Sequence, residues 1–222
     1  MPSYRYLFVV VALLFAAPSF AQTPQSCEGL KSLALQDGTV TTAAVVTGSV
    51  TPSGATNPNA TIANLPAFCR VAVTLKPTAD SDIKTEFWLP MSGWNRKLQS
   101  VGNGAWAGVI PYAAMAQAVT GGYATAGTDT GHVGNSASFV PGHPERLVDY
   151  GYRAVHEMTV AAKAVIRSFY GNAPQYSYWN GCSTGGRQGL MEAQRYPADY
   201  DGIIPGAPVN ARVHQMFWGL WV

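Results

Sequence analysis

The chain divides into short segments with strand-like or helix-like hydrophobic pattern, most clearly after residue 67. Alternating apolar and polar residues predict strands at 70–76, 83–89 and 97–101, and small or apolar runs predict three more strands, at 122–129, from Tyr176 onward and at 202–206. Apolar residues at every third or fourth position predict an amphipathic helix from Arg146 to Tyr170. Shorter helices are predicted at 111–119 and 186–195. Because strands and helices alternate, we expect an α/β fold, a mostly parallel sheet with flanking helices.

The first 21 residues have the pattern of a secretory signal peptide. Arg5 precedes an unbroken apolar run from Leu7 to Ala17, and the small residues Ser19 and Ala21 lie at positions −3 and −1 of a cleavage site. The alternative is a membrane anchor, but this run is shorter than the ~20 residues that cross a bilayer. We therefore expect cleavage after Ala21, a secreted or periplasmic protein, and no membrane partner.

Residues 22–66 have a different composition from the rest of the chain. They are rich in Thr, Ser, Ala, Gly, Pro and Asn and have no clear helical period. We interpret them as an irregular N-terminal arm with one or two strands, followed by the α/β domain at 67–222. The 201 residues left after cleavage are enough for one domain with a sizeable core.

The charge balance is close to neutral. Fourteen Lys and Arg against twelve Asp and Glu give a net charge of +2, which falls to +1 once Arg5 leaves with the signal peptide. This balance indicates neither a nucleic acid nor an anionic membrane as partner.

The most informative motif lies at residues 176–187, where the pattern predicts a strand, a sharp turn and the start of a helix. The turn has the form Gly-x-Ser-x-Gly, the nucleophile elbow of α/β-hydrolases, in which a serine lies on a strained turn at the end of a strand. Gly181 and Gly185 have no Cβ, so that strand and helix can pass close to each other. Ser183 is therefore the candidate nucleophile; the alternative is an ordinary glycine-rich strand–helix turn.

A serine hydrolase also needs donors for the oxyanion. In α/β-hydrolases one donor is the N–H of the residue after the nucleophile, here Thr184, and the other comes from a loop after an early strand. The Gly-Asn-Gly-Ala loop at 102–105 follows the strand predicted at 97–101, and Gly104 is the candidate second donor. This matching loop favours the elbow over an ordinary turn.

The general base and its orienting acid are harder to place. They normally follow the serine in the order acid, then histidine, and the 39 residues after Ser183 contain one histidine, His214. Its surroundings favour a surface or lid-packing histidine. Glu192 is expected to face away from the site, and Asp199 and Asp201 come too early for the usual acid.

The other three histidines precede the serine. His156 lies beside Glu157 in the long predicted helix, where a structural role is favoured over a base, and His132 and His143 lie further upstream. None has metal-ligand spacing to a cysteine or a carboxylate cluster. We therefore expect neither a metal site nor a cofactor in this chain.

Three cysteines remain, and exported proteins tend to pair theirs. A disulfide between Cys27 and Cys69 would fix the N-terminal arm to the domain and leave Cys182 without a partner in the chain. Cys182 would then be either a buried free thiol or half of a disulfide whose partner is outside the chain.

Residues 181–188 resemble the nucleophile motif of the tannase/feruloyl esterase family, which also includes the hydrolase of mono(2-hydroxyethyl) terephthalate. Four further segments are similar to signature stretches of that family: 101–108, 126–132, 151–158 and 195–204. The resemblance extends from about Cys27 to the C-terminus. It implies an α/β-hydrolase fold and a Cys27–Cys69 disulfide.

The resemblance also implies what these 222 residues lack. In that family the residue before the nucleophile is a cysteine bonded to a cysteine beside the catalytic histidine. The aspartate, the histidine and that second cysteine follow a large inserted lid, which in many members carries a structural calcium site. No position of this chain matches them. We therefore expect the N-terminal part of a longer esterase, an incomplete α/β-hydrolase without its C-terminal strands and lid, with Cys182 as an unpaired half-disulfide.

These observations predict a secreted serine esterase that cleaves small aromatic esters, feruloyl or galloyl in type, through an acyl-enzyme at Ser183. The chain alone should lack normal turnover, because a serine without its histidine loses most of its activation. The alternative is a catalytically inactive secreted remnant or binding domain on the same scaffold. A serine peptidase is a weaker third possibility, since Cys182 counts against it.

Overall fold

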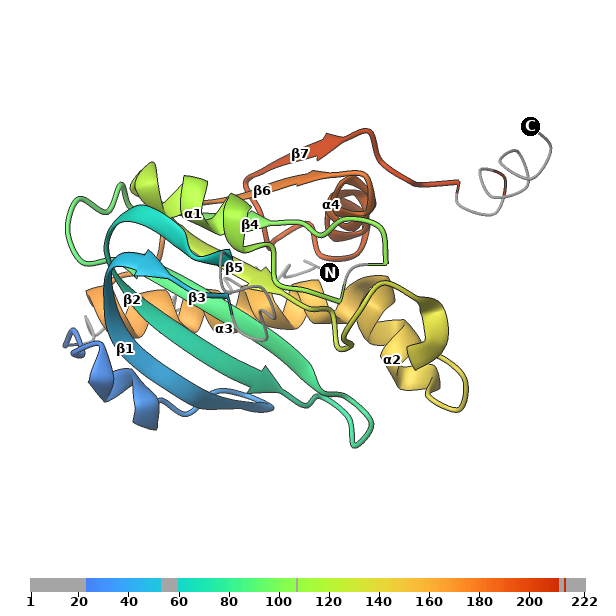
Figure 1. Cartoon of the computed structure of the whole chain (residues 1–222), viewed down its shortest axis with the longest axis horizontal. Coiled ribbons are helices and arrows are strands. Elements are labelled where there is room, and N and C mark those ends of the chain that lie inside the picture. Colours follow the sequence, from blue (N-terminus) through green and yellow to red (C-terminus); the bar gives the residue numbers. More distant parts are fainter. Residues whose placement is uncertain (1–22, 53–59, 107, 212–213, 215–222) are drawn as a thin grey trace, which may run out of the picture.

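The structure, a computed structural model, describes residues 23–52, 60–106, 108–211 and 214 (Figure 1). Its longer elements in chain order are β1 (Gly38–Val50), β2 (Ile62–Leu75), β3 (Ile83–Pro90), β4 (Lys97–Val101), α1 (Tyr112–Thr120), β5 (Ala124–Thr128), α2 (Pro144–Val148), α3 (Ala154–Tyr170), β6 (Tyr176–Cys182), α4 (Thr184–Arg195) and β7 (Gly202–Gly206). Short helical turns are η1 (Glu28–Ser32), η3 (Ala137–Phe139) and η4 (Asp149–Arg153). The predicted signal peptide, 1–21, lies outside the described residues.

The strands form one seven-stranded sheet in the order β1-β2-β3-β5-β4-β6-β7. Strands β1, β2, β3 and β5 pair antiparallel, whereas β5, β4, β6 and β7 pair parallel. The sheet is therefore mixed rather than mostly parallel. The cause is local, because the short turn between β2 and β3 can join only antiparallel neighbours. Strand β5, which consists of small, buried residues, lies at the centre of the sheet.

The N-terminal segment is more regular than the irregular arm expected for 22–66. It contains the whole of β1 and the start of β2, which pair from Gly38 opposite Leu75 to Val50 opposite Ile62. The boundary expected at residue 66 thus falls inside a strand. The hydrophobic pattern hides β1 because this edge strand is mostly exposed, so its regularity comes from backbone pairing to β2.

A disulfide joins Cys27 to Cys69, as the family resemblance implied. Both cysteines are buried, and Leu30 of η1 is fully buried beside them. The bond fixes the chain before β1 to the middle of β2.

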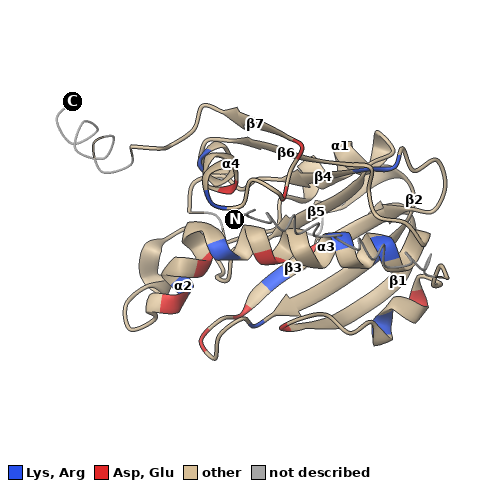
Figure 2. Cartoon of the chain, turned by 180° about the vertical axis from the view of Figure 1, so that it is seen from behind, with Lys and Arg blue, Asp and Glu red and all other residues tan. Residues whose placement is uncertain are grey.

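Helices cover both faces of the sheet (Figure 1). Helix α1 packs on one face, where Met115 contacts a cluster around Phe68 and Trp88. Helix α3 packs on the other face through residues such as Met158 and Val165, in the cluster that also contains Trp179. In Figure 2, isolated acidic and basic segments are scattered along the ribbon, in keeping with the small net charge. Within the described residues, no helix has the length and apolar character needed to cross a membrane.

The long predicted helix from Arg146 to Tyr170 consists of three consecutive parts. Helix α2 leads into η4, a π-helical turn, and η4 continues as α3. Helix α3 ends at Gly171, whose φ of 74° is the left-handed conformation that glycine adopts without strain. The π turn lies next to the candidate active site, as such turns often do.

Candidate active site

Ser183 lies between the end of β6 and the first residue of α4. Its φ of 59° and ψ of −116° are unusual for a residue with a side chain. This strained backbone is what a nucleophile elbow requires. Residue 183 is half-buried, between the exposed Cys182 and the buried Thr184.

Close backbone packing makes this turn possible. A Cβ on Gly181 would lie 2.6 Å from the carbonyl oxygen of Gly185. A Cβ on Gly102 would lie 2.5 Å from the Cα of Gly185. Strand, helix and the 102–105 loop therefore meet backbone against backbone, as the glycines of the motif predicted.

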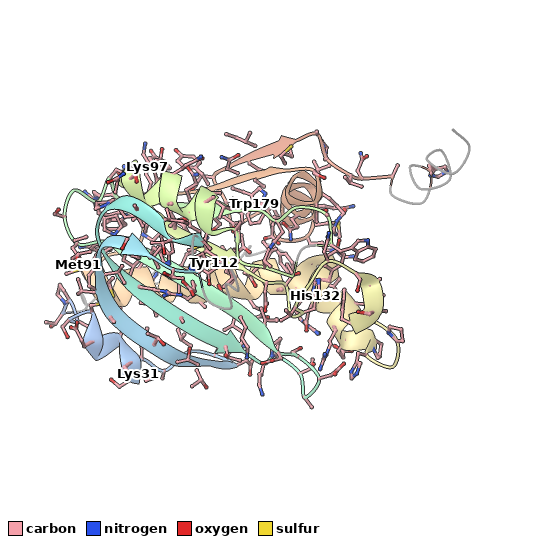
Figure 3. All side chains as sticks on the ribbon, viewed as in Figure 1. Lys31, Met91, Lys97, Tyr112, His132 and Trp179 are labelled. Carbon is pink, nitrogen blue, oxygen red and sulfur yellow. A yellow bond between two sulfur atoms is a disulfide. The ribbon has the colours of Figure 1, made fainter. Side chains whose placement is uncertain are left out.

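Hydrogen bonds hold the turn in place. The N–H of Ser183 donates to the carbonyl of Gly206 at 3.0 Å, and the indole N–H of Trp179 donates to the carbonyl of Gly185 at 2.9 Å. Figure 3 labels Trp179 next to α4. Both neighbouring strands, β6 and β7, thus fix the elbow.

The candidate oxyanion residues are brought together. The N–H of Gly185 donates to the carbonyl of Asn103 at 2.8 Å, and the hydroxyl of Thr184 donates to the carbonyl of Ala105 at 2.7 Å. Among the described residues, none accepts a hydrogen bond from the N–H of Gly104 or of Thr184. Two unengaged N–H groups beside Ser183 are what an oxyanion hole needs.

Asn103 holds this loop, a role that the sequence alone did not suggest. Its side-chain amide donates to the carbonyls of Val109 and Thr128 at 2.7 and 2.8 Å. The amide group of Gln188 donates to Asn103 Oδ1 at 3.0 Å and its Oε1 accepts from the Asn103 N–H at 3.1 Å. This reciprocal pair fixes the loop to α4. The two residues are 85 positions apart, so no local spacing could reveal it.

Arg187 connects α4 to the π turn. Its guanidinium donates to the carbonyls of Gly151 and Tyr150 at 2.8 and 3.2 Å and lies 5.0 Å from the centre of the Tyr150 ring. The Tyr150 hydroxyl in turn donates to the carbonyl of Ala105 at 3.3 Å. Elbow helix, π turn and oxyanion loop therefore form one connected network.

Aromatic side chains line the outer side of the same loop. Trp106 stacks on Tyr150 at 5.1 Å, and His132 stacks on Phe139 at 3.9 Å. Burial lowers the pKa of His132, so the neutral ring can donate from Nε2 to the carbonyl of Trp106 at 2.6 Å. The histidine is engaged in packing.

No histidine of the described residues forms a hydrogen bond with the Ser183 hydroxyl. His143 pairs with Asp80 and His156 with Asp199, each at 2.7 Å, and His214 is exposed. The structure therefore brings Ser183 together with its candidate oxyanion donors but not with a base.

The two late aspartates and Glu192 have structural positions instead. Asp201 accepts a hydrogen bond from the N–H of Ser177 at 2.7 Å, and Asp199 pairs with His156. Glu192 lies away from Ser183, and its side chain is fully buried next to His156 and Asp199. Burial, and then the nearby Asp199, raises the pKa of Glu192 to about 9.

Cys182 is exposed and has no disulfide partner among the described residues. Of the two interpretations of its thiol, the buried one is wrong. The other, a half-disulfide with a partner outside the chain, stays a prediction.

Comparison with known proteins decides the family. Residues 69–222 match the family model described as "Tannase and feruloyl esterase". The chain belongs to the tannase and feruloyl esterase family. It is 41% identical over 221 residues to an uncharacterised esterase of Xanthomonas campestris pv. campestris, and 40% identical over 156 residues to feruloyl esterase B of Aspergillus niger.

Solved structures of the family confirm the expected α/β-hydrolase fold. The crystal structure of feruloyl esterase B from Aspergillus oryzae has a TM-score of 0.80 and 37% identity, and it matches 87% of this chain. Tannin acyl hydrolase from Aspergillus niger has a TM-score of 0.62 and 31% identity over 85% of this chain. The chain covers only part of the length of these relatives. The match to the Xanthomonas protein includes 98% of this chain but 38% of that protein, and the match to the A. niger feruloyl esterase includes 69% of this chain but 30% of that enzyme. The chain likewise covers 39% of the solved feruloyl esterase B and 35% of the solved tannin acyl hydrolase.

Proposed function

We propose that Ser183 is the nucleophile of a secreted serine esterase that acts on aromatic esters. The observation that carries the proposal is the backbone of Ser183, at φ 59° and ψ −116°, next to the unengaged N–H groups of Gly104 and Thr184. The strained backbone of Ser183 has no evident structural purpose. The Ser183 side chain is half-buried and contributes little to the core, so packing does not explain the strain.

The reaction follows from this geometry. Ser183 Oγ attacks the ester carbonyl, its proton passes to a base, and the N–H groups of Thr184 and Gly104 donate to the oxyanion. The base returns the proton to the departing alcohol, which leaves the acyl group on Ser183. Water then attacks the acyl-enzyme with the same base as proton acceptor, and the acid is released with Ser183 restored.

The base and its orienting acid are proposed to lie in a longer protein of which this chain is the N-terminal part. Two observations support this: the described histidines are engaged elsewhere or exposed, and the relatives are much longer than the part that this chain covers. The exposed Cys182 beside Ser183 is then the half of a disulfide that would hold the base-bearing segment to the elbow.

Substrate class and location rest on other observations. Relatives named feruloyl esterase and tannin acyl hydrolase support an aromatic acyl group in the substrate. The Cys27–Cys69 disulfide supports an oxidising compartment outside the cytosol.

The test compares the 222-residue chain with the full product of its gene. Both are assayed on p-nitrophenyl acetate and methyl ferulate and are labelled with a fluorophosphonate probe, each with a Ser183→Ala control. We expect the full product to hydrolyse both esters and to lose hydrolysis and labelling in Ser183→Ala. The same activity in Ser183→Ala would overturn the proposal. Absence of both hydrolysis and labelling in the folded full product would instead favour the inactive remnant.

A further inference from the structure

A second group of polar side chains meets where α3 and α4 approach each other, away from Ser183. His156 comes from α3, Glu192 from the last turns of α4, and Asp199 from the loop before β7. One ligand atom from each of the three lies within 4.8 Å of the others. The three residues are separated by 36 and 7 positions, so the sequence pattern gave no sign of the group.

Glu192 is the unusual member. Its side chain has an exposed fraction of 0%, and neither carboxylate oxygen accepts a hydrogen bond from an N–H group of the described residues, whereas the Asp199 carboxyl group lies beside it. A buried carboxyl group is costly to ionise, and in proteins such groups are normally protonated, paired with a charge or bound to a metal. The Glu192 carboxyl group lies next to the His156 imidazole and the Asp199 carboxylate, and a cation could bind all three.

The one nearby lysine does not serve as the missing partner. The Lys163 ammonium donates to the backbone carbonyls of Ala198 and Asp199. It therefore fixes the loop that carries Asp199 through backbone oxygens rather than through the carboxylate of Asp199 or Glu192.

We propose that His156, Glu192 and Asp199 bind a divalent transition-metal ion of the Zn²⁺ type. One imidazole nitrogen and two carboxylate oxygens are a ligand set that zinc accepts, whereas Ca²⁺ and Mg²⁺ prefer oxygen ligands alone. The His156 and Asp199 side chains are 26% and 12% exposed, which leaves an open side for water as a further ligand.

Rotation of the side chains would complete the site. Bonds of about 2.1 Å in a tetrahedral arrangement place ligand atoms about 3.4 Å apart, so ligand atoms that lie within 4.8 Å of one another have to approach by up to about 1.4 Å. The hydrogen bond of 2.7 Å between His156 Nδ1 and Asp199 Oδ2 has to open, as both atoms turn toward the ion.

The expected role is structural. The ion would join α3 to the C-terminal end of α4, whereas Ser183 lies at the other end of that helix, ~13 Å away along its axis. The proposal is independent of the esterase proposal, because its readouts are metal content and stability rather than turnover.

The test uses untagged protein containing this chain, dialysed free of metal. Zinc is titrated against a colorimetric chelator, and thermal unfolding is followed with Zn²⁺, Ca²⁺ or no added metal. We expect one tightly held zinc per chain and a rise in Tm of several degrees with Zn²⁺ but not with Ca²⁺. A wild-type protein that binds no stoichiometric zinc overturns the proposal without any variant.

Two variants locate the ion. Glu192→Gln keeps the size of the side chain and removes its charge, and we expect at least a tenfold loss of zinc affinity and no Tm response to zinc. Glu157→Gln, next to His156 on α3 but outside the cluster, should bind zinc as the wild type does. Equal zinc affinity in Glu192→Gln and wild type would place the ion elsewhere and also overturn the proposal. If Glu192→Gln does not fold, His156→Gln replaces it, with the same expected loss and the same contrary outcome.

Discussion

The indole N–H of Trp179 donates to the backbone carbonyl of Gly185 at 2.9 Å, so the strand that leads into Ser183 holds the helix that leaves it. Trp179 is fully buried, and its ring lies so close to α4 that a Cβ on Gly189 would come within 2.7 Å of it. A strained residue such as Ser183 persists only where its surroundings fix it. This tryptophan is one of the groups that do so.

Trp179→Phe should therefore impair the elbow more than the fold. The variant loses one buried hydrogen bond and leaves a small cavity, and we expect a loss of about 2–4 kcal/mol of unfolding free energy. Fluorophosphonate labelling of Ser183 in the full product should fall at least tenfold, because the elbow relaxes.

Trp94→Phe is the matched control for this variant. Trp94 also donates its indole N–H to a carbonyl, that of Lys97 at 3.0 Å, and stacks on Tyr170, with no hydrogen bond to α4. It should lose stability but keep labelling. Equal labelling in the two variants would contradict a positioning role for Trp179.

Alanine at two glycines of the oxyanion loop should have very different effects on stability. A Cβ on Gly102 would lie 2.5 Å from the Cα of Gly185, whereas a Cβ on Gly104 meets nothing within 4 Å. We expect Gly102→Ala to cost about 2 kcal/mol or more, since backbone on both sides has to move. Gly104→Ala should change unfolding free energy by less than about 0.5 kcal/mol. Urea unfolding of the two variants checks the difference; similar midpoints would contradict the close packing of loop and elbow.

The elements that the sequence predicted well are those whose own side chains carry the signal. The stripe of α3, the glycines around Ser183 and the small residues of β5 each decide local structure directly. One or two strands were expected within 22–66, but the bounds of β1 could not be given, because an exposed edge strand depends on its partner β2 for its shape. The strand propensity of such a segment depends on the neighbouring strand, so it cannot be derived from the sequence of the segment alone.

The residues of the candidate site also fall into those that the sequence predicted and those that it did not. The motif identified Ser183 and Thr184 because an elbow is a contiguous turn. The Asn103–Gln188 pair and the burial of Glu192 were missed, since each depends on how α4 packs against residues far away in sequence. The pairing of Cys27 with Cys69 came from the family resemblance, because three cysteines alone allow other pairings.

Loss of the disulfide should destabilise the protein, and loss of the third cysteine should not. Cys27 and Cys69 are 42 residues apart, and a closed loop of that length corresponds to about 4 kcal/mol in the chain-entropy account. We expect the double variant Cys27→Ser, Cys69→Ser to lose about 2–4 kcal/mol.

The control is Cys182→Ser in the 222-residue chain, which removes an exposed thiol and should leave the Tm within about a degree. Intact-mass analysis of the unmutated 222-residue chain after alkylation without reduction should show one labelled cysteine, Cys182. Three labelled cysteines would contradict the bond between Cys27 and Cys69, and a large Tm loss in Cys182→Ser would show that this thiol is not free.

Asp129 should make the protein less stable as the pH rises through the acid range. Its side chain is buried, and desolvation raises its pKa from 3.8 to about 7. Between these values the unfolded chain loses the proton while the folded chain keeps it, so the contribution of Asp129 to stability falls with rising pH and levels off above about 7.

Asp129→Asn isolates this contribution. The amide oxygen can still accept from the N–H groups of Lys84 and Gly131, which Asp129 Oδ1 accepts at 2.9 and 2.8 Å. The variant should match the wild type near pH 4 and exceed it near pH 8, by at most about 4 kcal/mol from a pKa difference of about three. Urea unfolding at pH 4 to 8 measures the difference, with Asp37→Asn, an exposed carboxylate, as control. A constant difference between Asp129→Asn and wild type over this range would show that Asp129 is ionised throughout it.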